Sequence, residues 1–367
     1  MRMNVPLVDL KAQLGEIRTN VENSINDVLD KCNFILGEEV QQFERAFAQV
    51  CAVKHGVAVA SGTDALELAL RAAGVGAGDQ VIVPANTFIA TALAATACGA
   101  TPVPVDIDEK TFLIDVSKVK FTSKVKAIIP VHLYGRMMNL APLIDLAAKH
   151  KVAVIEDACQ AHGAELGGHK AGAVGLMGCF SFYPGKNLGG YGDGGLVTTN
   201  DDELKNKLEA LRNYGSPKKY HHPEIGMNSR LDTIQAAILL AKLPGLARGN
   251  ERRYRVARRY NEALAHAGDL VLPELPASGS HVFHLYVVRT KKRDALLNHL
   301  NKVGIGAGIH YPTPIHMHGA YADLDYKKGD FPVTERLCDE ILSLPVYPQI
   351  TDEQINYVVD ETRRFFE

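Results

Sequence analysis

The chain has 367 residues, of which 46% are hydrophobic and 22% charged, and its formal net charge is -2. This composition is that of an ordinary soluble protein, and the length is sufficient for two domains. Without a basic stripe, the sequence predicts no nucleic-acid partner. The first residues lack the apolar core of a signal peptide. The richest apolar run, around 85–100, is interrupted by Asn86 and Thr87, so we expect no membrane span.

The six cysteines are scattered and form neither a CxxC pair nor another spacing typical of a metal site. We therefore expect reduced thiols, mostly in the core, and no bound metal. Reduced thiols are typical of a cytoplasmic protein, which is the location the sequence predicts.

Between residues 55 and 200, short apolar runs alternate with Gly or Pro turns and helical stretches. Several runs are continuously apolar, as in strands that are covered on both faces of a mostly parallel sheet. The expected strands are 57–60, 80–83, 101–106, 126–132, 152–156, 177–182 and 195–199. The expected helices are 63–73, 89–98 and 140–150. This alternation predicts a large α/β domain.

After residue 201 the pattern changes to longer helical stretches. Helices are expected at 201–214, 232–243, 249–267 and 294–303, and a strand at 284–289. We predict a large α/β domain over residues 1–244 and a smaller α+β domain over residues 245–367. The N-terminal segment is free to pack on the smaller domain.

A glycine follows the first expected strand in the sequence Ser61-Gly62-Thr63. Glycine lets the backbone approach a ligand there, and the first N–H groups of the following helix favour a phosphate. An ordinary helix cap by Ser61 or Thr63 accounts for the same residues. Ser181, at the end of a later strand, is a candidate for the same phosphate or for a hydrogen bond to the backbone.

Two further side chains follow expected strands. Phe88, after the strand at 80–83, is either a ring that lies on an aromatic cofactor or a core phenylalanine. Asp157 ends the apolar run at 152–156, where a buried carboxylate needs a cation or a donor. A protonated pyridine ring is such a partner, and an ordinary turn cap is the alternative.

Lys186 lies in a glycine-rich loop directly after the expected strand at 177–182. An amine at the mouth of a buried strand is desolvated, which lowers its pKa and makes it a nucleophile able to form a Schiff base. A surface lysine is the alternative. Together with a phosphate cradle, Asp157 and Phe88, however, Lys186 completes the parts of a pyridoxal 5'-phosphate site at strand ends of one domain.

These motifs, in this order, resemble the DegT/DnrJ/EryC1/StrS family of sugar aminotransferases, whose members are fold type I pyridoxal phosphate enzymes. The resemblance runs nearly end to end. It rests on segments 34–37, 61–66, 84–88, 105–108, 130–135, 156–158, 183–189 and 226–232. The flank 183–189 looks like that of members that aminate carbon 3 of a nucleotide-linked keto-deoxysugar.

The resemblance implies a role for each matching residue. Lys186 would form the Schiff base and move the proton, and Asp157 would pair with the ring nitrogen. The remaining cofactor contacts would be Gln160 at the phenolic oxygen, Phe88 on the ring, and Gly62, Thr63 and Ser181 at the phosphate. Asn228 would reach the phosphate from a second subunit, giving a homodimer with shared active sites. His162 would lie near the cofactor or sugar, and the substrate would contact Tyr183, Lys219, Tyr220, His310 and Tyr311.

The sequence therefore predicts amination of a nucleotide-linked 3-keto-6-deoxyhexose, with dTDP as the expected nucleotide and L-glutamate as the expected donor. The alternatives are a 4-keto sugar aminotransferase, a related sugar dehydratase and a non-catalytic regulator of the same family. A dehydratase typically has histidine in place of the lysine, so Lys186 argues against it. An NAD enzyme would need a GxGxxG turn after its first strand, and the glycines near Lys186 do not follow that spacing.

Overall fold

The computed structural model describes residues 3–276 and 279–367. The centre of this part is a seven-stranded sheet in the order β1-β9-β8-β5-β4-β2-β3. Its strands are β1 (His55–Val59), β2 (Gln80–Pro84), β3 (Thr101–Val105), β4 (Val125–Ile128), β5 (Ala153–Asp157), β8 (Met177–Ser181) and β9 (Gly195–Thr199). β9 is antiparallel to β1 and β8, and the other neighbouring pairs are parallel. The predicted α/β fold with a mixed, mostly parallel sheet is confirmed.

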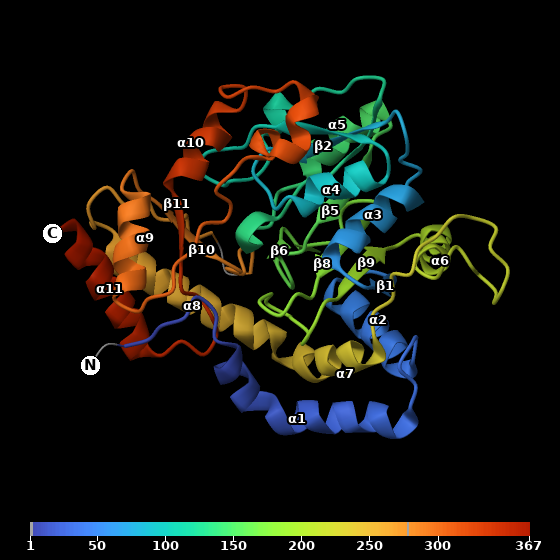
Figure 1. Ribbon diagram of the computed structural model, residues 1–367, viewed down its shortest axis with the longest axis horizontal. Coiled ribbons are helices and arrows are strands. Elements are labelled where there is room, and N and C mark those ends of the chain that lie inside the picture. Colours follow the sequence, from blue (N-terminus) through green and yellow to red (C-terminus); the bar gives the residue numbers. More distant parts are fainter. Residues whose placement is uncertain (1–2, 277–278) are drawn as a thin grey trace.

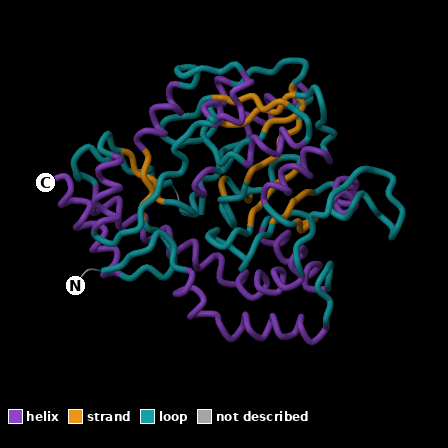
Figure 2. The backbone as a smooth tube through the Cα atoms, viewed as in Figure 1, coloured by secondary structure: helices purple, strands orange, loops and turns teal. Residues whose placement is uncertain are grey.

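Helices cover both faces of this sheet (Figures 1 and 2). They are α1 (Leu10–Lys31), α2 (Glu38–Val50), α3 (Gly62–Ala72), α4 (Ala90–Ala97), α5 (Ala141–His150), α6 (Asp202–Leu211) and α7 (Thr233–Lys242). Successive strand residues point to opposite faces. Accordingly, Val81 and Val83 belong to one hydrophobic cluster and Ile82 to another. Two buried faces explain why these strands read as continuous apolar runs.

The C-terminal part builds a second core around a small antiparallel sheet. That sheet pairs β10 (Tyr286–Arg289) with β11 (Ile341–Leu344). The helices of this core are α8 (Leu246–Leu264), α9 (Arg293–Lys302) and α11 (Asp352–Phe366). Val5 joins this core and pairs with Ile305. The remaining helix, α10 (Pro332–Glu340), contributes Leu337 to a cluster of the large sheet. The domain boundary at 244/245 stays a prediction. Leu285, which follows that boundary, packs in one hydrophobic cluster with Ile82 of the large sheet.

Several elements differ from the expectation. The strand expected at 126–132 ends as β4 at Ile128, and Val131 forms only an isolated bridge with Asp157. Pro130 interrupts the ladder because proline has no backbone N–H. Elements for which no prediction was made are α1, α2, α10, α11, β11 and a short hairpin of β6 (Glu165–Leu166) and β7 (His169–Lys170). Within the described ranges, no helix is long and apolar enough to cross a membrane.

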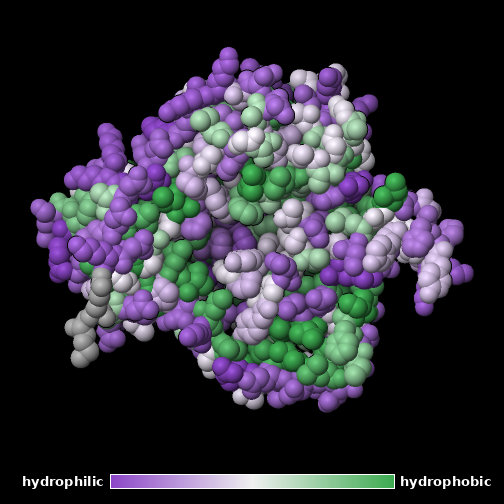
Figure 3. Space-filling view, viewed as in Figure 1, coloured by the Kyte–Doolittle hydropathy of each residue, from purple (hydrophilic) through white to green (hydrophobic). Residues whose placement is uncertain are grey.

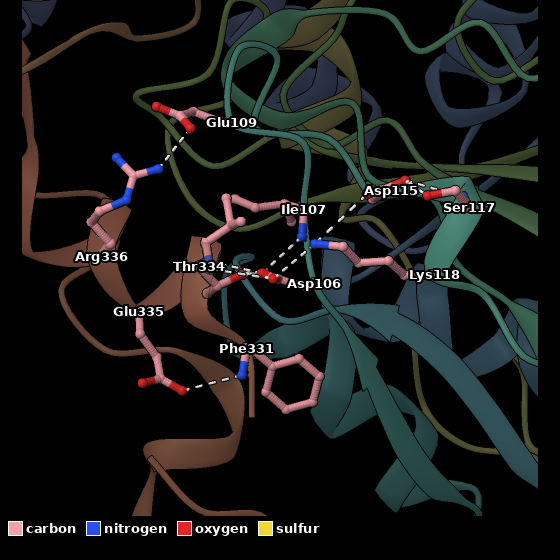
Figure 4. Close-up of polar contacts among 11 residues, drawn as sticks. Asp106, Ile107, Glu109, Asp115, Ser117, Lys118, Phe331, Thr334, Glu335 and Arg336 are labelled. Atoms are coloured by element: carbon pink, nitrogen blue, oxygen red, sulfur yellow. Dashed lines mark hydrogen bonds and ion pairs between the residues drawn. The ribbon is translucent and has the colours of Figure 1, made fainter. Parts of the chain in front are cut away.

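Asp106, directly after β3, joins the large sheet to α10 (Figure 4). Its carboxylate accepts hydrogen bonds from the backbone N–H and the hydroxyl of Thr334, both at 2.8 Å, and one from Lys118 Nζ at 3.0 Å. Burial acts to raise the pKa of Asp106, but these donors outweigh burial and lower it. A carboxylate at this place also satisfies the free N–H groups of the first turn of α10.

Replacing Asp106 by Asn turns one acceptor oxygen into a donor that faces the donors of Thr334 and Lys118. We expect Asp106→Asn to lower the free energy of unfolding by about 1.5–3 kcal/mol at pH 7, measured by urea denaturation. Because folding lowers this pKa, the stabilisation is complete above the ordinary value of 3.8 and is lost as the pH falls through the folded value. The difference between the two proteins should therefore shrink below that pH.

Asp108→Asn is the matched control. Asp108 is exposed and accepts hydrogen bonds within its own turn from Lys110 and Thr111, a role that an amide oxygen can also fill. We expect this control to unfold nearly like the unsubstituted chain. Equal effects of the two substitutions would contradict the role assigned to Asp106.

Candidate active site

A cavity of about 510 Å³ opens beside the carboxyl ends of β5 and β8. Open α/β sheets bind their ligands at this edge. The predicted site residues that line the cavity are Gly62, Thr63, Phe88, Asp157, Gln160, Ser181, Tyr183, Lys186, His310 and Tyr311. The structure thus gathers side chains from both ends of the chain around one space.

The first turn of α3 forms one wall of the cavity. Ser61 is the N-cap, and its hydroxyl accepts a hydrogen bond from Asp64 N–H at 3.1 Å. The earlier N–H groups of a helix have no partner within the helix, so those of Gly62 and Thr63 are suited to an anion. A Cβ on Gly62 would lie 2.5 Å from Ser181 Cβ and 3.0 Å from Cys159 Sγ. Gly62 therefore allows the helix start to pack against the end of β8.

Asp157 ends β5 and is only 6% exposed. Its Oδ2 accepts a hydrogen bond from the Thr91 hydroxyl at 2.8 Å, and its Oδ1 accepts one from Cys159 N–H at 3.2 Å. These two donors replace part of the hydration that the carboxylate loses on burial. Each oxygen keeps a further lone pair for a ligand in the cavity.

Lys186 reaches the same cavity from the loop after β8. The loop begins with a turn in which Lys186 N–H donates to Tyr183 O at 2.9 Å. Burial lowers the pKa of Lys186, while the nearby Cys159 and Asp157 act in the opposite direction. A lowered pKa increases the neutral fraction of the amine, which is the form that attacks a carbonyl carbon.

Three histidines surround Lys186 without adding positive charge. Burial lowers the pKa of His162 to about 3 and also lowers those of His284 and His310, and Lys186 itself contributes to each shift. At neutral pH all three rings are therefore uncharged. His162 does not line the cavity: its Nε2 lies 2.9 Å from Ser181 O, behind the wall.

Gln160, Tyr311 and Phe88 form the opposite side. Gln160 Oε1 accepts a hydrogen bond from Tyr134 N–H at 2.7 Å, and its Nε2 donates to the Tyr311 hydroxyl at 3.3 Å. The rings of Phe88 and Tyr311 lie with centroids 5.4 Å apart, and Phe88 is 51% exposed. Because Phe88 is exposed at the mouth of the cavity, its ring is better placed to lie on a bound ligand than to fill the hydrophobic core.

Asn228, Lys219 and Tyr220 are not among the residues that line the cavity. They lie in the loop between α6 and α7, and at the right of Figure 1 this loop extends away from the body of the molecule. Tyr220 is 85% exposed. Asn228 differs from the other two, because the neighbouring Ser229 hydroxyl donates to Asp64 Oδ2 in the first turn of α3 at 2.7 Å.

The cavity also contains residues that the sequence analysis did not single out. Leu7 and Val8 line it from the N-terminal segment, and Thr91, Cys159 and His284 line it from within the fold. Thr91 lies in α4 and Thr87 precedes that helix, so no helical spacing connected the two threonines in the sequence. Leu7 and Val8 gave no signal either, because their position depends on the pairing of Val5 with Ile305.

The residues around the cavity fit pyridoxal phosphate. They offer a desolvated amine, a buried carboxylate that lies near it, a helix start with free N–H groups and an exposed aromatic ring. Each matches one chemical group of that cofactor. In residues 3–276 and 279–367, no group of three His, Cys, Asp or Glu side chains could hold a metal ion.

Comparison with known proteins gives one consistent family. The profile of the DegT/DnrJ/EryC1/StrS aminotransferase family matches residues 16–363. The chain is 46% identical to a UDP-N-acetyl-3-dehydro-alpha-D-glucosamine 3-aminotransferase of Acidithiobacillus ferrooxidans, covering 98% of this chain and 97% of that protein. It is 45% identical to a dTDP-3-amino-3,4,6-trideoxy-alpha-D-glucose transaminase of Streptomyces venezuelae, covering 99% and 96%.

A third relative is named as a regulatory protein and not as an aminotransferase. The pleiotropic regulatory protein of Geobacillus stearothermophilus is 45% identical over 99% of each chain. Among solved structures, S. venezuelae DesV in complex with a ketimine intermediate superposes with a TM-score of 0.97 at 44% identity, covering 99% of both chains. The expected fold and family are thereby confirmed.

Gly62→Ala should disturb the site, because the added Cβ meets Ser181 and Cys159 at distances that atoms do not tolerate. We expect the dissociation constant for pyridoxal phosphate to rise about 5- to 150-fold, since overpacking of this size costs about 1–3 kcal/mol. Equilibrium dialysis of the cofactor measures this. Gly76→Ala is the control, because no atom lies within 4 Å of a Cβ there. Unchanged binding by Gly62→Ala would contradict the phosphate site.

Proposed function

The chain belongs to the DegT/DnrJ/EryC1/StrS aminotransferase family, and we propose that this member aminates carbon 3 of a nucleotide-linked 3-keto-6-deoxyhexose with L-glutamate as the amino donor. Like its family, it is a pyridoxal phosphate-dependent sugar aminotransferase. The observation that carries the proposal is the cavity in which Lys186, Asp157 and the first turn of α3 meet.

The geometry of the cavity supports a role for each of the site residues. Bound pyridoxal phosphate supplies an electron sink for the bond changes at the amino-bearing carbon. We propose that Gly62, Thr63 and Ser181 bind its phosphate, and that Asp157 holds the ring nitrogen in its protonated form. Phe88 supports one face of the ring, and Gln160 contacts the phenolic oxygen.

Lys186 is proposed as both the covalent attachment point and the group that moves the proton. Its lowered pKa leaves more of the amine neutral, so it can accept a proton from the carbon that carries the donor's amino group. It can then return that proton during the reverse sequence on the sugar. Leu7 and Val8 exclude water from the same space by lining it with apolar side chains.

The position of amination is supported by the names of the relatives. The A. ferrooxidans protein is a 3-aminotransferase by name, and the S. venezuelae protein is named for a 3-amino sugar. Those two names carry different nucleotides, UDP and dTDP. We propose dTDP for this chain, together with substrate contacts by Tyr183, His310 and Tyr311 from the cavity wall.

The alternatives retain specific support. A relative whose name mentions no 3-amino sugar, the GDP-perosamine synthase of Caulobacter vibrioides, is 40% identical over 88% of this chain, and a 4-keto sugar aminotransferase is the second candidate. The regulatory names of two relatives favour a non-catalytic protein. Against the latter stands the amine of Lys186, which a sensor that only binds a sugar does not need.

We propose a homodimer in which Asn228 completes the phosphate site of the partner subunit and Lys219 and Tyr220 contact its substrate. The loop between α6 and α7 carries all three residues and extends away from the body of the molecule in Figure 1, with Asn228 at its base, where it pairs with Asn213. None of the three lines the cavity of its own chain. Figure 3 shows hydrophobic side chains gathered over α7 and the adjacent edge of α1. Exposed apolar surface of this kind is typical of an interface. We also propose a cytoplasmic location, because all six cysteines are free thiols.

A mixture of two inactive variants tests the shared site. Lys186→Ala removes the amine from one cavity, and Asn228→Ala removes the proposed contact to the partner's phosphate. When the chains are mixed, hybrid dimers should contain one intact site, so transamination activity should return to about one quarter of that of the unsubstituted protein. That fraction follows from random pairing with two sites in each dimer. No recovery after subunit exchange, verified by mass spectrometry, would contradict the shared site.

The product identifies the reacting carbon. Incubation with 3-keto and 4-keto forms of dTDP- and UDP-linked 6-deoxyhexoses, each with L-glutamate, should give a 3-amino sugar with dTDP as the preferred nucleotide. The reason is orientation: the anchored diphosphate fixes which carbon reaches Lys186. NMR of the product locates the nitrogen. Amination only at carbon 4 would contradict the carbon-3 proposal, and no amination of any substrate would favour the regulator.

A further inference from the structure

Two buried threonine hydroxyls connect the segment after β2 to Asp157. Thr87 is 3% exposed and Thr91 is fully buried. The Thr87 and Thr91 hydroxyl oxygens lie 2.9 Å apart, and the Thr91 hydroxyl oxygen lies 2.8 Å from Asp157 Oδ2. Both threonines line the cavity, Thr91 from the first turn of α4 and Thr87 from the segment between β2 and α4, while Asp157 lies at the end of β5. The three groups thus form a continuous chain across two elements.

The direction of each hydrogen bond in this chain is fixed by the number of protons. A carboxylate only accepts, so the Thr91 hydroxyl must donate its one proton to Asp157. Thr91 then has only lone pairs left for Thr87, so the Thr87 hydroxyl donates to Thr91. Hydrogen bonds that follow one another in this way polarise each other and become stronger.

Asp157 has a second donor, Cys159 N–H, on its other oxygen at 3.2 Å. One donor comes from the turn after its own strand and the other from α4, so the carboxylate plane is fixed from two sides. The titratable groups that interact with Asp157 are Lys186, Cys159, Cys179 and Tyr311. Burial raises the pKa of both thiols and of the phenol, so these three groups are uncharged at neutral pH.

We propose that Thr91, supported by Thr87, is a positioning residue that holds the Asp157 carboxylate toward the cofactor's ring nitrogen. This inference rests on the proposed role of Asp157 in the proposed function. Thr91 touches the carboxylate and not the reacting atoms. Its hydroxyl keeps Oδ2 from rotating away, so the ring nitrogen retains its proton. Without that hydroxyl, Asp157 has one donor fewer and the hydroxyl of Thr87 loses its acceptor.

Thr91→Val tests this, because valine keeps the branched shape and removes only the hydroxyl. NMR of bound pyridoxal phosphate labelled with ¹⁵N at the ring nitrogen measures the pKa of that nitrogen. We expect this pKa to be about one unit lower than in the unsubstituted protein, which is a tenfold lower affinity for the proton. The cofactor's dissociation constant should rise about 10-fold, as for a lost hydrogen bond to a charged group. The kcat should fall by a similar factor, with KM for L-glutamate nearly unchanged. Thr91→Ser should restore all three values to within about threefold.

Thr96→Val is the matched control on the same helix. The Thr96 hydroxyl bonds to Ala92 O and lies 3.2 Å from the Tyr321 hydroxyl, away from Asp157. This control should leave the ring-nitrogen titration unchanged, and Thr87→Val should shift it in the same direction as Thr91→Val but less. Thermal unfolding of the cofactor-free proteins verifies that each variant folds.

Three outcomes overturn the inference in distinguishable ways. If Thr91→Val leaves the ring titration unchanged while Asp157→Asn removes the ring proton, the positioning role is wrong and the proposed function stands. If Asp157→Asn also leaves the ring protonated, the role of Asp157 itself is wrong. A shift by Thr96→Val equal to that of Thr91→Val would reduce the effect to packing of α4 and would likewise overturn the inference.

Discussion

The parallel pairing of β5 with β8 is the constraint on which the site depends. The register places Asp157 opposite Cys179, so the carboxyl ends of both strands open at one edge. Asp157 is thereby brought to the same cavity as the loop that carries Lys186. A shift of one residue would turn Asp157 to the other face of the sheet, away from Lys186.

Glu156, the residue before Asp157, holds this register from the opposite face. Its carboxylate is fully buried and accepts N–H groups of Gly172 at 2.8 Å and of Val174 and Gly175 at 2.7 Å. His132 Nδ1 accepts from Met138 N–H, so its Nε2 carries the proton and donates to Glu156 at 2.9 Å. Burial acts to raise the pKa of Glu156, but His132 and the N–H groups outweigh burial and lower it. Glu156 thus stabilises the fold on one face of the sheet, whereas Asp157 faces the cavity on the other.

Much of this arrangement could be predicted from local signals. The sheet was predictable because buried parallel strands are continuously apolar, and Lys186 and Asp157 were noticeable because polar residues there interrupt apolar runs. The α/β fold and the family were confirmed, whereas the individual residue roles and the domain boundary stay predictions. Local patterns could not reveal Leu7 and Val8, which reach the cavity through the pairing of Val5 with Ile305. Nor could they show that Asn228 is not among the residues that line the cavity of its own chain.

Position, and not a lowered pKa alone, distinguishes Lys186 from another buried lysine. Lys242 provides the comparison: it is buried, and burial lowers its pKa to about 8. Its Nζ, however, donates to Gly189 O and lies 4.7 Å from the centre of the Tyr191 ring, outside the cavity of Asp157. A reactive amine therefore exists in this chain without the carboxylate and the helix start that the cofactor needs.

The most direct measurement is to trap the cofactor on the protein. Purified protein is incubated with stoichiometric pyridoxal phosphate and reduced with borohydride, and the modified lysine is located by peptide mass spectrometry. The account predicts that the label is found on Lys186 and that it is lost in Lys186→Ala without moving to Lys242. Label on Lys242, or spread evenly over surface lysines, would contradict the central claim that this cavity is the cofactor site.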